Sequence, residues 1–321
     1  AQPNVDEASK RSGLAEHRAQ PGPHEELERH HRAHRVPREP EDRGLAALAE
    51  RERLAGLHPH LPERRVDASA REGVEVGNNS PFAKFVPAEQ VERSAAQQYL
   101  QMLSQADSKR ALAHSDSAEL KRLRSIAQKI IPFAIAWNPR AKEWKWEVNL
   151  IGSNQINAYC MPGGKIAFFT GILQQLRLTD DEVAMVMGHE MAHALREHAR
   201  ERMGKGMATQ GVARLGGALV SSFFGIDPRL TDIAAGGIAN LTTLVFSRED
   251  ESEADLVGME LAARAGYDPR AGVTLWQKMG AASKGAPPQW LSTHPAGARR
   301  IADIQANLPK VLPLYERARV K

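Results

Sequence analysis

The chain has 321 residues, enough for one sizeable domain or two small ones. It carries 43 Lys and Arg against 39 Asp and Glu, a formal charge of +4 that is spread along the sequence. No basic patch is interleaved with aromatic residues, so nucleic-acid binding is not supported, and the single Cys excludes an intrachain disulfide and a thiolate-rich zinc site.

Residues 1–75 are expected to form a polar, disordered extension. They are rich in His, Arg and Glu and nearly lack aromatic residues, so they cannot bury enough apolar surface to fold alone. A short helix over 44–57 and loose metal binding by the histidines of 30–34 are alternatives. No secretory leader is visible, because a basic start followed by an apolar run is missing. We expect the folded domain to occupy 76–321.

The first elements of this domain are predicted from hydrophobic periodicity. Apolar residues recur at helical spacing over 87–103 and over 117–131. Segments 144–151 and 165–170 alternate or run apolar, as strands do. The stretch 157–164 lies between them and predicts an edge strand that leads into a turn.

A helix is predicted to begin after Thr179 and to carry the sequence HEMAH at 189–193. Thr179 and Glu182 have the spacing of a capping box, and acidic residues fill the first turn. Gly204 and Gly206 are expected to end this helix.

The HEMAH sequence indicates a metal site. Residues four apart share one face of a helix, so His189 and His193 can point at one metal ion, with Glu190 beside them. This pattern predicts zinc and peptide-bond hydrolysis. The alternative is a helix whose histidines fall four apart by chance. His198 lies about 140° around the same helix from His193, so we predict a surface or supporting role for it.

The connection over 204–246 is rich in Gly and Ala and has several short apolar runs. These runs are shorter than the roughly 20 residues that a membrane span needs, and charged residues interrupt them. We expect packed helices that cover the active-site cleft, and association with a membrane surface is the alternative.

A second helix is predicted to begin at Ser247, with Asp250 as its capping partner, and to close at 265–266. Its first turns are acidic. Glu251 and Asp255 share a face, so Glu251 could supply the third zinc ligand while Asp255 accepts the second N–H of a ligating histidine.

The choice of this third ligand stays open on spacing alone. Glu249 and Glu253 compete with Glu251 for the role, and a solvated acidic face is the commoner use of such a charge run. Helices are also predicted over 269–279 and from Pro295 to about Asn307. Few aromatic residues, abundant Ala and this order of elements predict an α+β, predominantly helical fold with a small sheet beside a helical bundle.

Four motifs in this order resemble peptidase family M48, zinc metallopeptidases of the gluzincin group. They are the stretch NAYCMPGGKI from Asn157 with Thr170-Gly171, HEMAH, the stretch SREDESEAD from Ser247, and STHP from Ser292 with Arg300-Ile301. The resemblance covers about 85–315. It implies a zincin-like metallopeptidase domain, one zinc ion per chain, Glu251 as the third ligand and Asp255 as its partner residue.

In appearance the chain is most similar to the Oma1-like, LoiP-like and BepA-like bacterial envelope peptidases of this family. That similarity implies a periplasmic or envelope-associated protein that acts on unfolded or misassembled proteins in quality control. No oligomeric state is predicted.

Further roles follow for single residues. Glu190 is expected to act as the general base towards a zinc-activated water. His294 is the first candidate to donate to the developing oxyanion, but in similar family members the corresponding histidine can swing onto the zinc. A third role for His294 is to cap the helix that starts at Pro295. Arg300 is expected to support the site or to pair with a carboxylate.

The edge strand has two interpretations. Beside the zinc it could pair with an extended substrate through main-chain hydrogen bonds, with Asn157, Ala158, Gly163 and Gly164 shaping the contact. It could also be a simple sheet edge before a turn. The leading hypothesis for the whole chain is a zinc endopeptidase, and the alternative is a client-binding factor of the same fold with a gated, rarely active zinc site.

Overall fold

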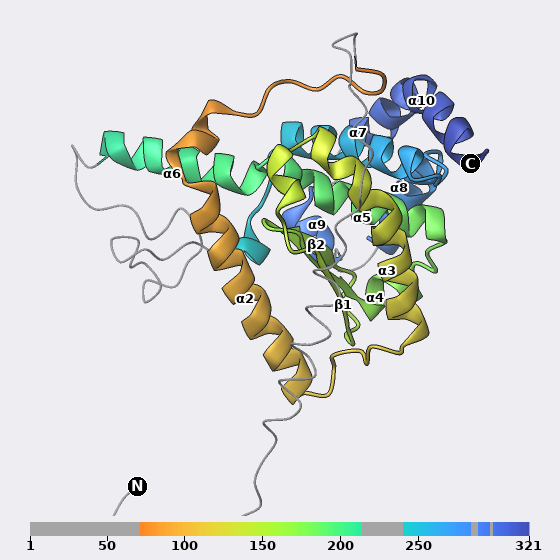
Figure 1. Ribbon diagram of the computed structural model, residues 1–321, viewed down its shortest axis with the longest axis horizontal. Coiled ribbons are helices and arrows are strands. Elements are labelled where there is room, and N and C mark those ends of the chain that lie inside the picture. Colours follow the sequence, from red (N-terminus) through yellow and green to blue (C-terminus); the bar gives the residue numbers. More distant parts are fainter. Residues whose placement is uncertain (1–70, 214–239, 284–287, 296–297, 321) are drawn as a thin grey trace, which may run out of the picture. The chain divides into compact units, whose positions relative to one another are not determined.

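The structure is a computed structural model and describes residues 71–213, 240–283, 288–295 and 298–320. Helices predominate and surround a small sheet (Figure 1), which confirms the predicted fold class. The described α-helices, 3₁₀-helices (η) and strands are, in chain order, η1 (Pro81–Phe85), α2 (Ala88–Ser108), α3 (Ala118–Ile130), η2 (Ile131–Ala136), η3 (Pro139–Lys142), β1 (Glu147–Ile151), β2 (Ala158–Met161), β3 (Lys165–Phe169), α4 (Thr170–Gln175), α5 (Asp180–Leu195), α6 (His198–Ala213), η6 (Leu241–Thr243), α7 (Arg248–Arg264), α8 (Ala271–Ala282), α9 (Gln289–Thr293) and α10 (Ala298–Arg319).

The sheet has the strand order β1-β3-β2. β1 runs parallel to β3 with Val148 opposite Ile166, and β2 runs antiparallel to β3 with Cys160 opposite Ile166. β2 therefore lies at one edge of this sheet, as predicted. The strands are shorter than expected, because Trp144 lies before β1 and Thr170 already begins α4.

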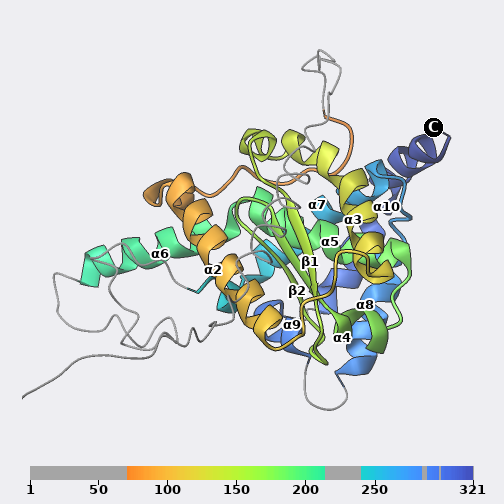
Figure 2. The same ribbon diagram turned by 60° about the horizontal axis from the view of Figure 1, so that its bottom comes forward.

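Side chains from the two faces of the sheet enter two hydrophobic cores. Ile166 and Phe168 pack with residues of α3, α5, α7 and α8 in the larger core. Ala167 packs with Tyr99 and other residues of α2 in the smaller one. Figure 2 shows α2 on one side of the sheet and α3 on the other. The alternation of side chains along a strand thus decides which helices each strand residue meets.

Both predicted capping boxes are present. The Thr179 hydroxyl accepts from the Glu182 N–H at the start of α5, and the Ser247 hydroxyl accepts from the Asp250 N–H at the start of α7. α7 ends as expected, with Gly266 in the left-handed conformation at φ +84°. Local sequence signals therefore determine where the two helices that carry the candidate ligands begin.

The helix that carries HEMAH does not continue to Gly204, so that prediction is wrong. α5 ends at Leu195, Glu197 adopts the left-handed conformation at φ +60°, and α6 starts at His198. The helix ends here because of tertiary packing. Leu195 is buried in the larger core and Ala199 in the smaller one, and the change of direction at Glu197 lets both be buried.

The last helix is longer than predicted. α10 runs from Ala298 to Arg319 and passes through Pro309 and Pro313, although a proline inside a helix removes a hydrogen bond. Val311 and Leu314 beside these prolines are buried in the larger core. Burial of this apolar face outweighs the local helix-breaking signal.

Several expectations fall partly or wholly on residues that the structure does not describe. These are the extension over 1–70 and the middle of the connection, 214–239. The domain boundary expected after residue 75 stays a prediction, and Val74 just before it is 3% exposed and packs in the larger core. Among the described helices, none is both long enough and apolar enough to span a membrane.

A buried carboxylate ties the first turn of α5 to α8. Glu182 accepts hydrogen bonds from Lys278 Nζ at 2.6 Å, from the Thr179 N–H at 2.8 Å and from the Thr274 hydroxyl at 2.9 Å. Burial raises the pKa of Glu182, but these donors outweigh burial and hold the pKa below its ordinary value of 4.5. A carboxyl group with a lowered pKa in the folded state stabilises the fold above its unfolded pKa, and this stability is lost as the pH falls through the folded pKa.

Lys278→Met should therefore lower the free energy of unfolding at pH 7 by roughly 1.5 kcal/mol, because a hydrogen bond to a charged group is lost. It should also reduce the loss of stability on acidification below pH 4.5. Urea unfolding between pH 7 and pH 3 measures both, with Lys142→Met at an exposed position as the control. An unchanged pH dependence in Lys278→Met would contradict this assignment.

Candidate metal centre

The candidate centre lies where α5 crosses α7. The crossing is close because a glycine from each helix meets the other: a methyl group on Gly188 would lie 2.5 Å from the Gly258 carbonyl oxygen, and one on Gly258 would lie 2.5 Å from the His189 backbone nitrogen. The absence of both side chains lets the two backbones touch. This contact brings the imidazoles of α5 next to the acidic turn of α7.

Four buried side chains place one donor atom each in a single cluster, and these atoms lie within 4.8 Å of one another. The residues are His189, His193, Glu251 and His294. His189 Nε2 and His193 Nε2 are 3.1 Å apart, and each is 3.5 Å from a carboxylate oxygen of Glu251. The structure thus brings together the three side chains that the sequence analysis assigned to the metal.

The structure places the two competing carboxylates elsewhere. Glu249 is exposed, and Glu253 pairs with Arg196 on the far side of His193. Among the three acidic side chains, Glu251 alone enters the cluster that the described residues form.

His294 is the fourth member of the cluster. It ends α9, where it is 3% exposed, and its Nδ1 lies 2.9 Å from Glu251 Oε1 and 3.3 Å from His189 Nε2. Its Nε2 lies 3.6 Å from Glu190 Oε1. α10 begins only at Ala298, and 296–297 lie outside the described residues. The predicted helix at Pro295 therefore does not explain the position of His294.

The donor set fits a zinc ion. Zinc binds imidazole nitrogen and carboxylate oxygen at about 2.0–2.2 Å, and tetrahedral geometry then separates neighbouring donors by about 3.3–3.6 Å. Five of the donor separations run from 2.9 to 3.5 Å, and all four donor atoms lie within 4.8 Å of one another. Their size and chemistry match a single small divalent cation among all four residues.

Asp255 and Arg300 form the polar layer behind the cluster. Asp255 Oδ1 lies 3.0 Å from His189 Nδ1. The Arg300 guanidinium donates to both oxygens of Asp255, at 2.6 and 2.7 Å, and to Glu251 Oε2 at 2.6 Å. Its cationic carbon lies 3.7 Å above the centroid of the Trp276 ring. Arg300 thus fixes the two carboxylates that face His189, as the predicted pairing requires.

The protonation states suit a cation in the cluster. Burial lowers the pKa of His193 well below its ordinary value, so this imidazole is neutral. Burial would also lower the pKa of His189, but Asp255 and Glu251 raise it to about 9. Burial raises the pKa of Glu251, yet His189 and His294 hold it below its usual range, so the carboxylate is ionised. A bound cation would replace the proton of His189.

Glu190 lies on α5 between the two histidines and is 2% exposed. One of its oxygens accepts a hydrogen bond of 2.6 Å from Trp290 Nε1. Trp290 is fully buried in α9, where it stacks on His294 and on Trp276. The same short helix therefore holds both Glu190 and His294.

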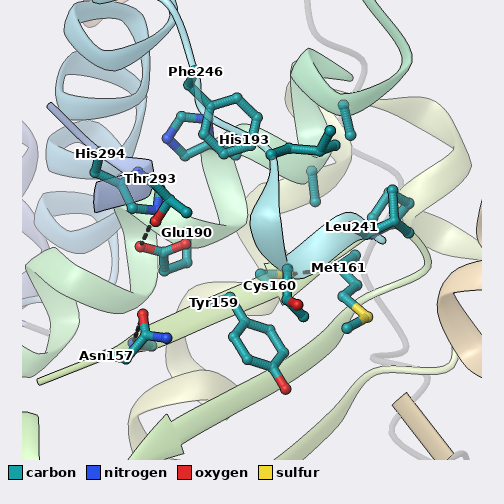
Figure 3. A pocket seen from close by; sticks show the side chains of 16 residues that line it. Asn157, Tyr159, Cys160, Met161, Glu190, His193, Leu241, Phe246, Thr293 and His294 are labelled. Carbon is teal, nitrogen blue, oxygen red and sulfur yellow. Dashed lines mark hydrogen bonds and ion pairs between the residues drawn. The ribbon is translucent and has the colours of Figure 1, made fainter. Parts of the chain in front are cut away.

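A pocket opens between β2, α5 and the segment that leads into α7 (Figure 3). Its described walls include 157–162, Glu190, His193, Phe246 and His294. Asn157 and Ala158, two of the four residues predicted to shape a substrate contact, line it. Gly163 and Gly164 do not, because they form the turn between β2 and β3 with φ of +84° and +77°.

Two residues near the cluster, Trp290 and Phe246, were not predicted, and His198 lies closer to the cluster than its sequence position indicates. Trp290 holds Glu190, the Phe246 ring stacks on His193 with ring centres 4.0 Å apart, and His198 is 2% exposed with its Nδ1 2.9 Å from His193 Nδ1. Trp290 is four residues before His294, which is the one local signal that could have revealed it. The break between α5 and α6 brings His198 to His193, so the supporting role and not the surface role describes it.

The chain is similar to one family of known proteins. The family model described as "Peptidase family M48" matches residues 117–308. The mitochondrial metalloendopeptidase OMA1 of Arabidopsis thaliana is 38% identical over 172 residues, which cover 53% of this chain and 33% of the relative. The metalloprotease LoiP of Escherichia coli is 29% identical over 206 residues, 64% of this chain and 77% of the relative.

The beta-barrel assembly-enhancing protease of Escherichia coli is 30% identical over 175 residues, which cover 51% of this chain and 35% of the relative. The match to OMA1 and the match to this protease therefore each span about a third of the relative's length. The family match contains α5, α7 and His294.

Proposed function

The chain belongs to peptidase family M48, because the family match over 117–308 covers more than half of its 321 residues, and from this premise we propose that it is a zinc-dependent endopeptidase. The observation that carries the proposal is the buried cluster of two α5 imidazoles and the Glu251 carboxylate, with donors separated as zinc requires. His189, His193 and Glu251 would hold one zinc ion per chain.

A bound zinc ion would lower the pKa of a water molecule and polarise the carbonyl of the scissile peptide bond. The chain's own residues supply the remaining steps. Glu190 accepts the proton of the attacking water and passes it to the leaving amine. The hydrogen bond from Trp290 Nε1 at 2.6 Å keeps the Glu190 carboxylate oriented towards the pocket.

His294 has two roles that the geometry supports. Its Nε2 is directed towards Glu190, where a donor would stabilise the oxyanion of the reaction. Its Nδ1 lies among the ligand donors, where it would occupy the position that a catalytic zinc site leaves open. The second arrangement favours the alternative function, a client-binding factor whose zinc site is gated and rarely active.

The substrate class that fits the pocket is an extended polypeptide. β2 is the edge strand and its residues line the pocket together with Glu190 and His193. An extended segment can pair with such an edge through main-chain hydrogen bonds, and unfolded chains offer many such segments. We therefore propose unfolded or misassembled proteins as substrates.

We further propose a quality-control role in the bacterial periplasm or envelope. Its support is the similarity to LoiP and to the beta-barrel assembly-enhancing protease, both from Escherichia coli. Association with a membrane surface through the connection before α7 stays a prediction, because 214–239 lie outside the described residues.

Cleavage of unfolded casein by the purified chain tests the proposed function. Removal of metal with a chelator should abolish cleavage, and one equivalent of zinc per chain should restore it. Intact casein after incubation with the zinc-loaded protein would contradict the proposed peptidase function.

His294→Ala separates the two roles of His294. The variant should cleave faster than the wild type if His294 gates the zinc, and more slowly if His294 stabilises the oxyanion. Activity that appears only in His294→Ala would favour the gated alternative.

A further inference from the structure

The two histidines of α5 differ in what lies behind them. A histidine that binds zinc through Nε2 carries its proton on Nδ1, and this N–H needs an acceptor that fixes the ring and its tautomer. Behind His189 this acceptor is the Asp255 carboxylate, 3.0 Å from Nδ1. Behind His193 it is another imidazole, since His198 Nδ1 lies 2.9 Å from His193 Nδ1.

His198 occupies this position because of the break between the two helices. The left-handed Glu197 redirects the chain, so the His198 ring meets the His193 ring edge-on, with centres 4.9 Å apart and planes at 76°. Phe246 stacks on a face of the His193 ring. His193 is thus held at its Nδ1 edge by His198 and on one face by Phe246.

The other ring nitrogen of His198, Nε2, faces the carboxylate of Glu253. If Nδ1 of His198 accepts from His193, its proton must be on Nε2. This buried Nε2 makes no hydrogen bond within the described part of the chain, but Glu253 Oε2 lies 3.7 Å away. Glu253 is paired with Arg196, which also donates to the Gly77 carbonyl. The carboxylate is therefore anchored next to the imidazole.

We infer that His198 is a positioning residue for the metal: its Nδ1 accepts the proton of His193 Nδ1 and so keeps His193 Nε2 directed at the cluster. Glu253 faces the other nitrogen of His198 and stabilises this arrangement. Asp255 contacts His189 directly, whereas Glu253 acts on His193 through His198. Glu253 thus acts behind a ligand and not as one. This inference rests on the proposed function, because it concerns the zinc that His193 would bind.

Zinc affinity measures this role without reference to catalysis. Apo-protein competes with a chromophoric chelator for zinc, and the dissociation constant is compared between variants. His198→Phe keeps an aromatic ring but removes the acceptor, and should weaken zinc binding by about 10- to 100-fold. His198→Asn places its side-chain oxygen near the former Nδ1, and should stay within a few-fold of the wild type.

Two further measurements separate positioning from a structural role. His114→Phe changes an exposed histidine outside the cluster, whose ring lies 2.7 Å from Asp116, and should leave affinity unchanged. Nitrogen-15 NMR of the zinc-loaded wild type should show His193 with its proton on Nδ1. Circular dichroism of each apo-variant establishes that it is folded.

The outcomes are distinct. If the wild type binds zinc and folded His198→Phe binds it equally well, or if NMR places the His193 proton on Nε2, the inference is wrong. If His198→Phe does not fold, the NMR tautomer and the affinity of His198→Asn decide. If the wild type itself binds no zinc, the proposed function fails and the inference with it.

Discussion

Glu190→Gln should lower the rate of casein cleavage by a factor of about 10²–10⁴, the usual contribution of a general acid–base group. An amide cannot accept the proton of the attacking water, whereas its size and shape nearly equal those of the carboxylate. Gln can still accept the hydrogen bond from Trp290 Nε1, which lies 2.6 Å from Glu190 Oε1. The fold and the zinc content should therefore be unchanged.

The comparison needs a matched variant on the acidic run of α7. Glu249→Gln removes one negative charge at an exposed position outside the cluster, and its cleavage rate should equal that of the wild type. Wild-type activity in zinc-loaded Glu190→Gln would exclude Glu190 as the base. Loss of zinc together with activity would instead make Glu190 a ligand.

Gly258→Ala should separate the two helices that carry the ligands. The added methyl group would lie 2.5 Å from the backbone nitrogen of His189, so α5 and α7 must move apart. Such overpacking costs about 1–3 kcal/mol of unfolding free energy. It should also weaken zinc binding, because the movement carries His189 away from Glu251.

Gly280→Ala is the control for helix propensity. Gly280 lies inside α8, and a methyl group there meets nothing within 4 Å. This variant should gain about 0.4–1 kcal/mol of stability and keep the zinc affinity of the wild type. Chemical unfolding and chelator competition on both variants measure the two effects. Equal stability and equal affinity of Gly258→Ala would show that the glycine contact does not set the geometry of the site.

The parts of this fold that the sequence predicts are those with local causes. The capping boxes at Thr179 and Ser247 mark the starts of both ligand-bearing helices, because a cap involves residues only three apart. The helical repeat puts His189 and His193 on one face for the same reason. The alternation of strand residues similarly indicates which sides of the sheet are buried.

The remaining features depend on contacts between distant segments. The end of α5 at Leu195 and the course of α10 through Pro309 follow from burial against two cores, which outweighs local propensity. The positions of His198 and Trp290 follow in turn from that break and from the packing of α9. No spacing rule along one helix could place either residue beside the cluster.

The choice of Glu251 among the acidic residues of α7 depends partly on a local pattern and partly on a contact between distant segments. Glu251, Asp255 and Gly258 are four and then three residues apart, so they share one helix face. Glu249 and Glu253 lie off it. A glycine in this register marks the face where another backbone approaches, and this signal could have favoured Glu251 from the sequence alone. The structure gives the reason for this glycine, because Gly258 packs against Gly188.

The central claim is that His189, His193 and Glu251 bind one zinc ion. Crystals of the full chain grown with zinc and measured on both sides of the zinc absorption edge test it directly. The expected result is one anomalous peak about 2.0–2.2 Å from Nε2 of each histidine and from a carboxylate oxygen of Glu251. A fully loaded protein whose anomalous peak lies elsewhere, or whose three side chains stand too far apart to share one ion, would contradict the account.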